Sequence, residues 1–138
     1  MVKQLSVMLE NSSGSLYPVI RALADENIDI KALTIADTER YGILRIVVDN
    51  TGKAIDVLKR SGYVAKITDI ICVILEDKPG AFAGVLDLLE KGQTGLEYVY
   101  VLGRTGDGNI RMLLRAADNV QTEKLLAGNG YTVLNKMQ

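Results

Sequence analysis

Two short polar turns carry the residue types best suited to holding a small charged molecule. They are Glu10–Ser15 and Glu76–Ala81, and each contains a glycine and follows an aliphatic run. Each turn is expected to lead into a helix, whose first backbone N–H groups lack an intrahelical partner and carry a partial positive charge. Such a helix start can hold a carboxylate, and a glycine lets the ligand come close to the main chain.

A hydrogen-bond acceptor in each turn would suit the other end of an amino acid. Asn11 in the first turn and Asp77 in the second could accept hydrogen bonds from an ammonium group. A turn that offers both kinds of partner suits a free α-amino acid. The simpler interpretation is that Asn11, Ser13 or Ser15 caps the first helix and Asp77 the second, while the glycines turn the chain. Spacing alone favours this capping interpretation.

Residue types used for catalysis and metal binding near neutral pH are scarce in this chain. It has no His and no Trp, and its one cysteine, Cys72, lies in an apolar run. Because no His could activate this thiol, Cys72 is expected to be a buried packing residue. The segment Thr105–Asn109 is rich in oxygen atoms but lacks the distal Glu of a calcium loop, which favours a hairpin turn. We therefore expect no enzymatic activity, no metal and no cofactor.

The composition restricts the class of protein and the kinds of partner that the chain could bind. The 138 residues include 16 Lys and Arg against 17 Asp and Glu, so the chain does not bind nucleic acid or membrane surfaces by bulk charge. A hydrophobic content of 48% predicts a compact folded protein. No leader-like segment opens the chain, and no apolar run approaches the roughly 20 residues of a membrane span, so we expect a cytoplasmic protein.

The chain repeats itself at about half its length. The segment Leu5–Leu16 returns as Ile71–Phe82, and Arg45 falls on Arg111 at the same offset of 66 residues. The alignment continues to the end of each copy, where a Gly-Tyr pair recurs at an offset of 68. Self-similarity of this kind predicts a tandem repeat of one structural unit. We expect a first module over residues 1–68 and a second over residues 69–138.

Hydrophobic periodicity predicts the same order of elements in both copies: strand, helix, strand, strand, helix, strand. In the first copy the strands are expected near 3–9, 27–37, 41–49 and 63–67, with helices near 16–26 and 51–62. In the second copy the strands are expected near 70–75, 96–102, 109–115 and 131–134, with helices near 81–91 and 120–127. This order predicts an α+β fold of two ferredoxin-like (βαββαβ) modules, each with two helices on one face of a four-stranded sheet.

One predicted strand is apolar on both faces, with Ile70, Cys72 and Ile74 on one side and Ile71, Val73 and Leu75 on the other. A sheet with one face in water should instead alternate apolar with polar residues. The face opposite the helices therefore needs a cover, which the other module, a symmetry mate or both could supply. We expect a tightly packed tandem that could also form a homodimer.

The turn Asp77–Gly80, set between strand and helix in a duplicated βαββαβ order, resembles the ACT domain, a regulatory module that binds amino acids in many metabolic enzymes. The resemblance extends over nearly the whole chain. The stand-alone tandem form of the family is the most similar, and the segments Ile35–Thr38 and Tyr41–Arg45 are typical of that group.

The resemblance implies that ligand contacts come from the strand-to-helix turn of one module and the edge strand of its neighbour. Carried over by position, it implies these ligand-binding residues: Asp77, Pro79, Gly80, Ala81 and Phe82 in the second copy, and Asn11, Ser13, Gly14, Ser15 and Leu16 in the first. Ser13 stands where the family has a proline, and Gly92–Gly95 replaces an apolar stretch. Only one of the two sites, or neither, is therefore expected to work.

The sequence thus predicts a non-catalytic regulatory protein that binds a small effector, most simply an amino acid, between modules. The alternative is a ligand-free interaction or dimerisation module that docks on a metabolic enzyme. Neither hypothesis involves nucleic acid or a membrane.

Overall fold

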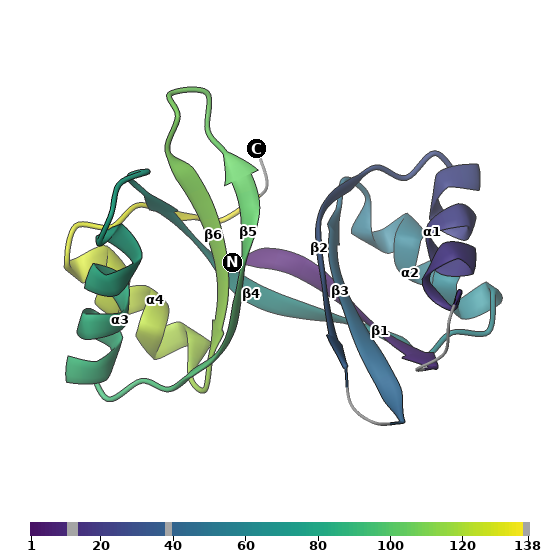
Figure 1. The fold of residues 1–138 in the computed structure, drawn as a ribbon, viewed down its shortest axis with the longest axis horizontal. Coiled ribbons are helices and arrows are strands. Elements are labelled where there is room, and N and C mark those ends of the chain that lie inside the picture. The colour runs from purple at the N-terminus through teal and green to yellow at the C-terminus, as the bar shows by residue number, and fades with distance from the viewer. Residues whose placement is uncertain (11–13, 38–39, 137–138) are drawn as a thin grey trace. The chain divides into compact units, whose positions relative to one another are not determined.

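The computed structural model describes residues 1–10, 14–37 and 40–136, and in them the same series of elements occurs twice (Figure 1). In chain order the elements are β1 (Val2–Glu10), α1 (Leu16–Asp25), β2 (Ile30–Asp37), β3 (Tyr41–Val48), α2 (Thr51–Arg60), β4 (Ala65–Leu75), α3 (Ala81–Lys91), β5 (Leu96–Arg104), β6 (Ile110–Ala116), α4 (Asn119–Gly128) and β7 (Val133–Leu134).

The chain divides into two compact units. We call them the N-terminal unit, Lys3–Thr68, and the C-terminal unit, Asp69–Gln138 together with Met1–Val2. In the N-terminal unit the strand order is β2-β3-β1-β4, and β3 pairs antiparallel with both β1 and β2. In the C-terminal unit the order is β7-β4-β6-β5, with antiparallel pairing throughout. Each unit thus places its first and third strands at the centre of its sheet.

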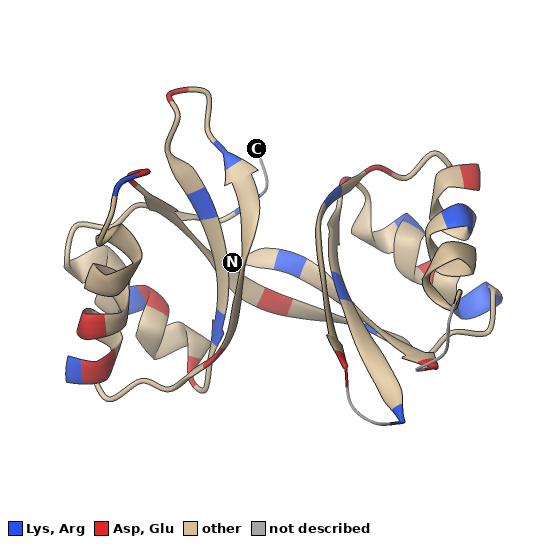
Figure 2. Ribbon diagram, viewed as in Figure 1, with Lys and Arg blue, Asp and Glu red and all other residues tan. Residues whose placement is uncertain are grey.

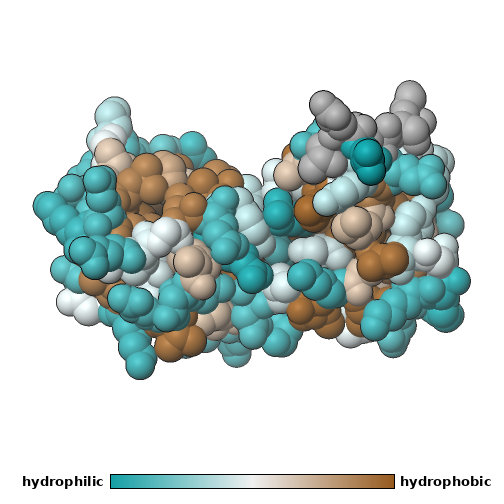
Figure 3. All heavy atoms as spheres, turned by 90° about the horizontal axis from the view of Figure 1, so that it is seen from below, coloured by the Kyte–Doolittle hydropathy of each residue, from teal (hydrophilic) through white to brown (hydrophobic). Residues whose placement is uncertain are grey.

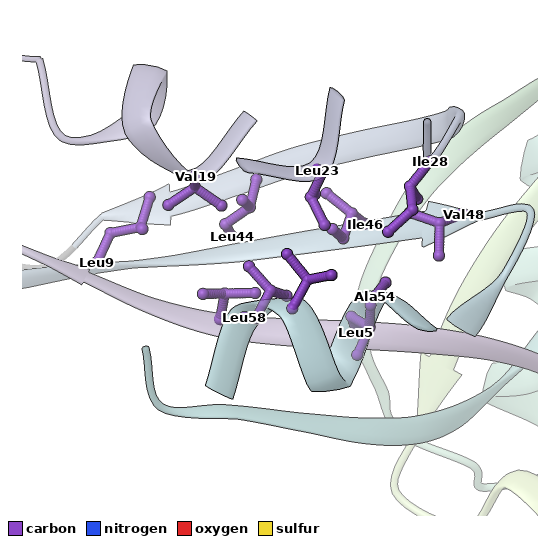
Figure 4. Close-up of a cluster of buried hydrophobic side chains, with 12 residues drawn as sticks. Leu5, Leu9, Val19, Leu23, Ile28, Leu44, Ile46, Val48, Ala54 and Leu58 are labelled. Carbon is purple, nitrogen blue, oxygen red and sulfur yellow. The ribbon is translucent and has the colours of Figure 1, made fainter. Parts of the chain in front are cut away.

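The core of the N-terminal unit lies between its sheet and its two helices. Helices α1 and α2 cover one face of the sheet (Figure 1). Leu5 and Leu9 alternate along β1 and point to this face, where they meet Val19 and Leu23 of α1 and Leu58 of α2 (Figure 4). The apolar stripe of each helix is therefore buried against the inner face of the sheet.

The C-terminal unit is built in the same way. Val85 and Leu89 of α3 and Leu126 of α4 pack against Ile71 and Val73 of β4 in one apolar core. The two units confirm the predicted α+β fold of two βαββαβ modules.

The other face of the C-terminal sheet is buried as well. Ile70, Cys72 and Leu113 have no exposed surface, although they lie outside the core that faces the helices. Cys72 and Leu113 are direct partners in the pairing of β4 with β6. The central strand is therefore apolar on both sides, as its sequence predicts.

Strand β4 is longer than expected. Two separate strands were predicted, near 63–67 and 70–75, whereas one strand of 11 residues runs from Ala65 to Leu75. Neither Gly nor Pro occurs between these ends, and β-branched residues are frequent among them, so nothing in the local sequence interrupts the extended backbone. The N-terminal part of this strand belongs to one unit and the C-terminal part to the other.

Strand β2 begins later than expected, at Ile30 and not at Asn27. Asn27 adopts a left-handed conformation with a φ of 58°. Its N–H donates to the carbonyl of Ala24, at 3.0 Å, and the next N–H, of Ile28, donates to Leu23. These hydrogen bonds satisfy carbonyl groups at the C-terminal end of α1. Asn is, after Gly, a residue that adopts the left-handed conformation at this position. The final strand is also shorter than expected, Val133–Leu134 instead of 131–134.

Charged residues of both signs are interspersed along the chain (Figure 2), and hydrophobic residues reach the surface in several places (Figure 3). The more exposed of the large apolar residues include Leu33 on β2 and Val101 on β5, and both strands lie at an edge. Among the described residues, none of the helices has both the length and the apolar character that a membrane crossing requires.

Helix α4 allows a direct test of its packing. Leu126 is fully buried, whereas Val120 of the same helix is 57% exposed. Leu126→Ala should lower the free energy of unfolding by about 3 kcal/mol, because it removes buried methyl groups and leaves a cavity, while Val120→Ala should change it by less than about 0.5 kcal/mol. Urea unfolding followed by circular dichroism measures both. Equal effects of the two substitutions would contradict the placement of α4.

Burial also gives Cys72 a pH-dependent effect on stability. Loss of solvation raises the pKa of its thiol to about 11, and the charge of Arg111 opposes this shift more weakly. The folded-state pKa lies above the ordinary value of 9.0, so the neutral thiol favours the fold below pH 9, and this contribution disappears as the pH rises through 11. Stability should therefore fall between these values. In Cys72→Ala the fall should be smaller when unfolding is measured across the same range, and an identical pH profile would refute the assignment.

Candidate ligand-binding site

The turn into α1 is shaped by a glycine. Gly14 has a φ of +84°, a left-handed conformation that side chains disfavour, and Ser15 follows it at the N-cap position of the helix. The Ser15 side chain makes no capping hydrogen bond, which corrects the expectation that it caps α1. Asn11 and Ser13, the other residues expected here, lie outside the described part of the chain.

The four helices differ in how they begin. The side chain of Asn50 accepts a hydrogen bond of 3.0 Å from the N–H of Lys53 at the start of α2, and Asp118 accepts one of 3.1 Å from Gln121 at the start of α4. At α1 and α3 the N-cap residues, Ser15 and Gly80, provide no such bond. Among the described helices, the two that follow the glycine turns thus begin without a cap from their N-cap side chain.

The first glycine turn opens onto a pocket of about 530 Å³, which we call the turn pocket. The end of β1, the start of α1 and the connection from α2 to β4 surround it. Its lining residues are Met8, Leu9, Glu10, Gly14, Ser15, Pro18, Ser61, Gly62, Tyr63 and Val64. Two of the expected ligand-binding residues, Gly14 and Ser15, are therefore part of its wall.

The turn pocket combines two opposite electrostatic features. The start of α1, which the Ser15 side chain does not cap, contributes the partial positive charge of a helix N-terminus. Glu10 contributes a carboxylate at the end of β1 and is the acid among the described lining residues. A molecule with an anionic end and a cationic end close together matches both features.

The second glycine turn is engaged by the protein's own groups. Gly80 is left-handed like Gly14, with a φ of +86°, but the carboxylate of Asp77 pairs with the guanidinium of Arg104 on β5. The N–H of Ala81, the first residue of α3, donates to the carbonyl of Lys78 at 3.2 Å. Asp77, which is expected to hold an ammonium group, thus already has a cationic partner within the protein.

A tyrosine further distinguishes the second turn from the first. A Cβ atom placed on Gly84 of α3 would lie 3.4 Å from the hydroxyl oxygen of Tyr131, so this hydroxyl lies directly against the helix. The corresponding residues of the first copy are Pro18 and Tyr63, and both line the turn pocket. The same fold thus places a tyrosine against the helix in one unit and at the wall of a pocket in the other.

The remaining expected residues are divided between core and surface. Leu16 packs against the N-terminal core, and Ala81 and Phe82 pack against the C-terminal core. Pro79 and Gly80 are exposed. Within residues 1–10, 14–37 and 40–136 there is no group of three or more His, Cys, Asp or Glu side chains that could hold a metal ion.

Sequence reasoning missed one wall of the turn pocket. The segment Ser61–Val64 connects α2 to β4 and lies far from Gly14 in the sequence. It reaches the pocket because β4 lies beside β1 in the sheet, and the N–H of Met8 donates to the carbonyl of Val64 at 3.0 Å. The left-handed Gly62 was the available signal, since it ends the helix and directs the chain toward this edge.

Comparison with known proteins gives two kinds of match. Acetolactate synthase small subunits are similar over part of the chain: that of Buchnera aphidicola subsp. Schizaphis graminum is 30% identical over 70 residues, which is 51% of this chain and 44% of the relative. The match thus spans less than half the length of this curated relative. That of Haemophilus influenzae is also 30% identical over 70 residues, 43% of its length.

Solved structures match over nearly the whole chain. A Bacteroides thetaiotaomicron protein is 34% identical, with a TM-score of 0.88 over 96% of this chain and 91% of that chain. The ligand-free regulatory subunit of aspartate kinase from Thermus thermophilus is 14% identical, with a TM-score of 0.65 over 93% and 92%, and shows the same fold. A family model described as an ACT domain pair matches residues 1–135. The chain therefore belongs to the ACT domain pair family.

Proposed function

We propose that this protein is a non-catalytic regulatory protein that binds a free α-amino acid in the turn pocket. One observation carries the proposal: the start of α1, which its N-cap side chain leaves uncapped, shares a pocket of about 530 Å³ with the carboxylate of Glu10. The helix start would hold the α-carboxylate and Glu10 would hold the α-ammonium group. Gly14 and Ser15 would let the ligand approach the main chain.

The first turn of α1 contributes few backbone donors. Leu16 and Tyr17 each carry an N–H, whereas Pro18 has none. Two bonds from these amides to a carboxylate, and one from the ammonium to Glu10, would each contribute about 1.5–3 kcal/mol before ordering costs. After those costs we expect dissociation constants of about 1 µM to 1 mM.

We propose a secondary role at most for the second turn. Asp77 already pairs with Arg104, and the N–H of Ala81 already donates to Lys78. A ligand at this turn would have to displace these interactions within the protein, which costs free energy. The expected residues Pro79, Gly80 and Phe82 would then serve mainly to shape the turn.

The names of the relatives support a regulatory role. Acetolactate synthase small subunits and a regulatory subunit of aspartate kinase share sequence or fold with this chain. We infer that amino-acid binding shifts an equilibrium between this protein and an enzyme partner, since a ligand that prefers one state stabilises that state. In this inference the protein both binds a small effector and docks on an enzyme, so the two hypotheses drawn from the sequence apply together.

A ligand screen tests the proposal directly. Each of the twenty amino acids, at about 10 mM, is added to the protein while its thermal unfolding is recorded, and hits are followed by isothermal titration calorimetry. One amino acid, or a few of related chemistry, should raise the unfolding temperature to a saturating level, because a ligand that binds only the folded state stabilises it. Absence of binding by both methods would contradict the proposal and leave the ligand-free docking module as the alternative.

Matched substitutions then locate the site. Glu10 and Glu76 occupy equivalent positions in the two copies, but Glu76 pairs with Lys78 at 3.1 Å, outside the turn pocket. Glu10→Gln should weaken amino-acid binding about tenfold or more, because it removes the charge that holds the ammonium group. Glu76→Gln should leave the dissociation constant within about twofold. A larger loss in Glu76→Gln than in Glu10→Gln, measured by calorimetry, would move the site to the second turn.

A further inference from the structure

The turn pocket has a side-chain wall as well as the main-chain wall that the glycine turn forms. Five of the described lining residues carry a wholly or largely apolar side chain: Met8, Leu9, Pro18, Tyr63 and Val64. The described lining includes neither Lys nor Arg, and Glu10 is the acid in it. Once the two charged ends of an amino acid are held, the part left for the apolar wall to contact is the ligand's side chain.

The end of α2 holds Tyr63 at this wall. The N–H of Tyr63 donates to the carbonyl of Leu58 at 3.0 Å, and the N–H of Gly62 donates to that of Lys59 at 3.1 Å. Gly62 is left-handed, with a φ of +89°, so the chain leaves the helix in a fixed direction just before the tyrosine. Part of the Tyr63 side chain packs against the N-terminal core. The tyrosine is therefore positioned before a ligand arrives, which lowers the cost of ordering it on binding.

Pro18 gives Tyr63 less room against its helix than the equivalent tyrosine has in the second copy. There the residue that corresponds to Pro18 is Gly84, and a Cβ atom placed on it would lie 3.4 Å from the hydroxyl oxygen of Tyr131. Proline adds the carbons of its ring to this place, which the tyrosine hydroxyl approaches in the other unit. The exchange of glycine for proline thus separates a tyrosine that lies against a helix from a tyrosine that borders a pocket.

Pro18 and Tyr63 lie at the end of the pocket where the ligand's carboxylate is proposed to bind. Pro18 is the third residue of α1 and follows Leu16 and Tyr17, whose amides would hold that carboxylate. The α-carbon of an amino acid is bonded directly to its carboxylate, so the ligand's side chain begins close to this first turn. A side chain that covers the rings of Pro18 and Tyr63 removes apolar surface from water, which favours binding.

Charged and polar side chains gain less from this wall. An acidic side chain would bring a second negative charge near Glu10, and a basic one would compete with the ligand's own α-ammonium group for the same carboxylate. An amide side chain would exchange water for the apolar rings, which costs free energy. The hydroxyl groups of Ser15 and Ser61 could serve a polar side chain, so the amide amino acids are the closest rivals.

We propose that the turn pocket selects an α-amino acid whose side chain is apolar and larger than a methyl group, and that Tyr63 determines this specificity. The proposal rests on the function proposed for the turn pocket and adds the class of ligand. Pro18 contributes by limiting the room that Tyr63 has against α1. The charged ends of the ligand remain with the helix start and Glu10, so Tyr63 acts on the ligand's side chain alone.

Pairs of amino acids of similar shape test the specificity. Leucine with asparagine, and methionine with glutamine, are titrated into the full chain and followed by calorimetry. In each pair the apolar member should bind at least about fivefold more tightly, because only its side chain gains from contact with the rings. Equal or tighter binding of a polar or charged amino acid would overturn the specificity and leave the amino-acid function intact. Absence of binding by every amino acid would overturn both.

A matched pair of tyrosine substitutions assigns the role to Tyr63. Tyr63→Ala should lower the preference for leucine over asparagine at least about threefold. The affinity for glycine, a ligand without a side chain, should stay within about twofold when it is followed at the Gly14 and Ser15 amides in ¹H–¹⁵N spectra. A merely structural role would weaken all three ligands alike. The control is Tyr131→Ala, which changes the equivalent residue of the second copy and should leave the preference within about twofold.

A variant at an exposed position keeps the test decisive if Tyr63→Ala proves unstable. Tyr63 is partly buried against the core, whereas Pro18 is exposed, so Pro18→Ser should stay folded. It should lower the preference for leucine over asparagine in the same direction as Tyr63→Ala, because it removes one of the two rings. An unchanged preference in either variant that folds, or an equal loss in Tyr131→Ala, would refute the assignment.

Discussion

The left-handed glycine between first strand and first helix is the constraint on which the candidate site depends. Gly14 and Gly80 have φ angles of +84° and +86°, and each reverses the chain within a few residues of a central strand. The reversal brings the first turn of a helix to the end of that strand. Side chains other than glycine disfavour this backbone, so the position of the helix start follows from one residue in each copy.

The two copies show how one backbone can serve different purposes. Helices α1 and α3 both begin without a cap from their N-cap side chain, whereas Asn50 and Asp118 cap α2 and α4. At the second turn the guanidinium of Arg104 balances the charge of the Asp77 carboxylate. At the first turn, Glu10 lies at the wall of a pocket instead. Both helix starts share a left-handed glycine, and the described difference between them lies in the side chains.

Much of the fold could be predicted from the sequence, because local patterns determine it. Alternation along β1, helical spacing in α1 and the left-handed Gly62 are properties of neighbouring residues, and the structure agrees with each. The late start of β2 was missed because Asn27, a residue that tolerates the left-handed conformation, closes the helix in place of a glycine. The unbroken β4 was missed because a repeat in the sequence suggested a boundary that the backbone does not show.

The candidate site could be predicted only in part. Gly14 and Ser15 were expected at the ligand and line the pocket, since the strand-to-helix turn is a local feature. Glu10 was expected to begin the turn and not to line the pocket. The pairing of Asp77 was missed because Arg104 is 27 residues away and comes close only because β6 pairs with both β4 and β5. Contacts that depend on sheet order leave no mark in residue spacing.

The second turn is exposed, and this exposure affects how far the sequences of the two halves can diverge. Residues 76–80 are all exposed, whereas the cores of both units are built from residues of the helices and strands. Mutations at residues 76–79 should leave folding largely intact, since surface substitutions away from caps and cores usually change stability little, whereas Gly80 is required by its left-handed backbone. After duplication, selection for a folded product would tolerate drift at these exposed positions of the second turn. One half can therefore lose or exchange its specificity while the other preserves the ancestral one.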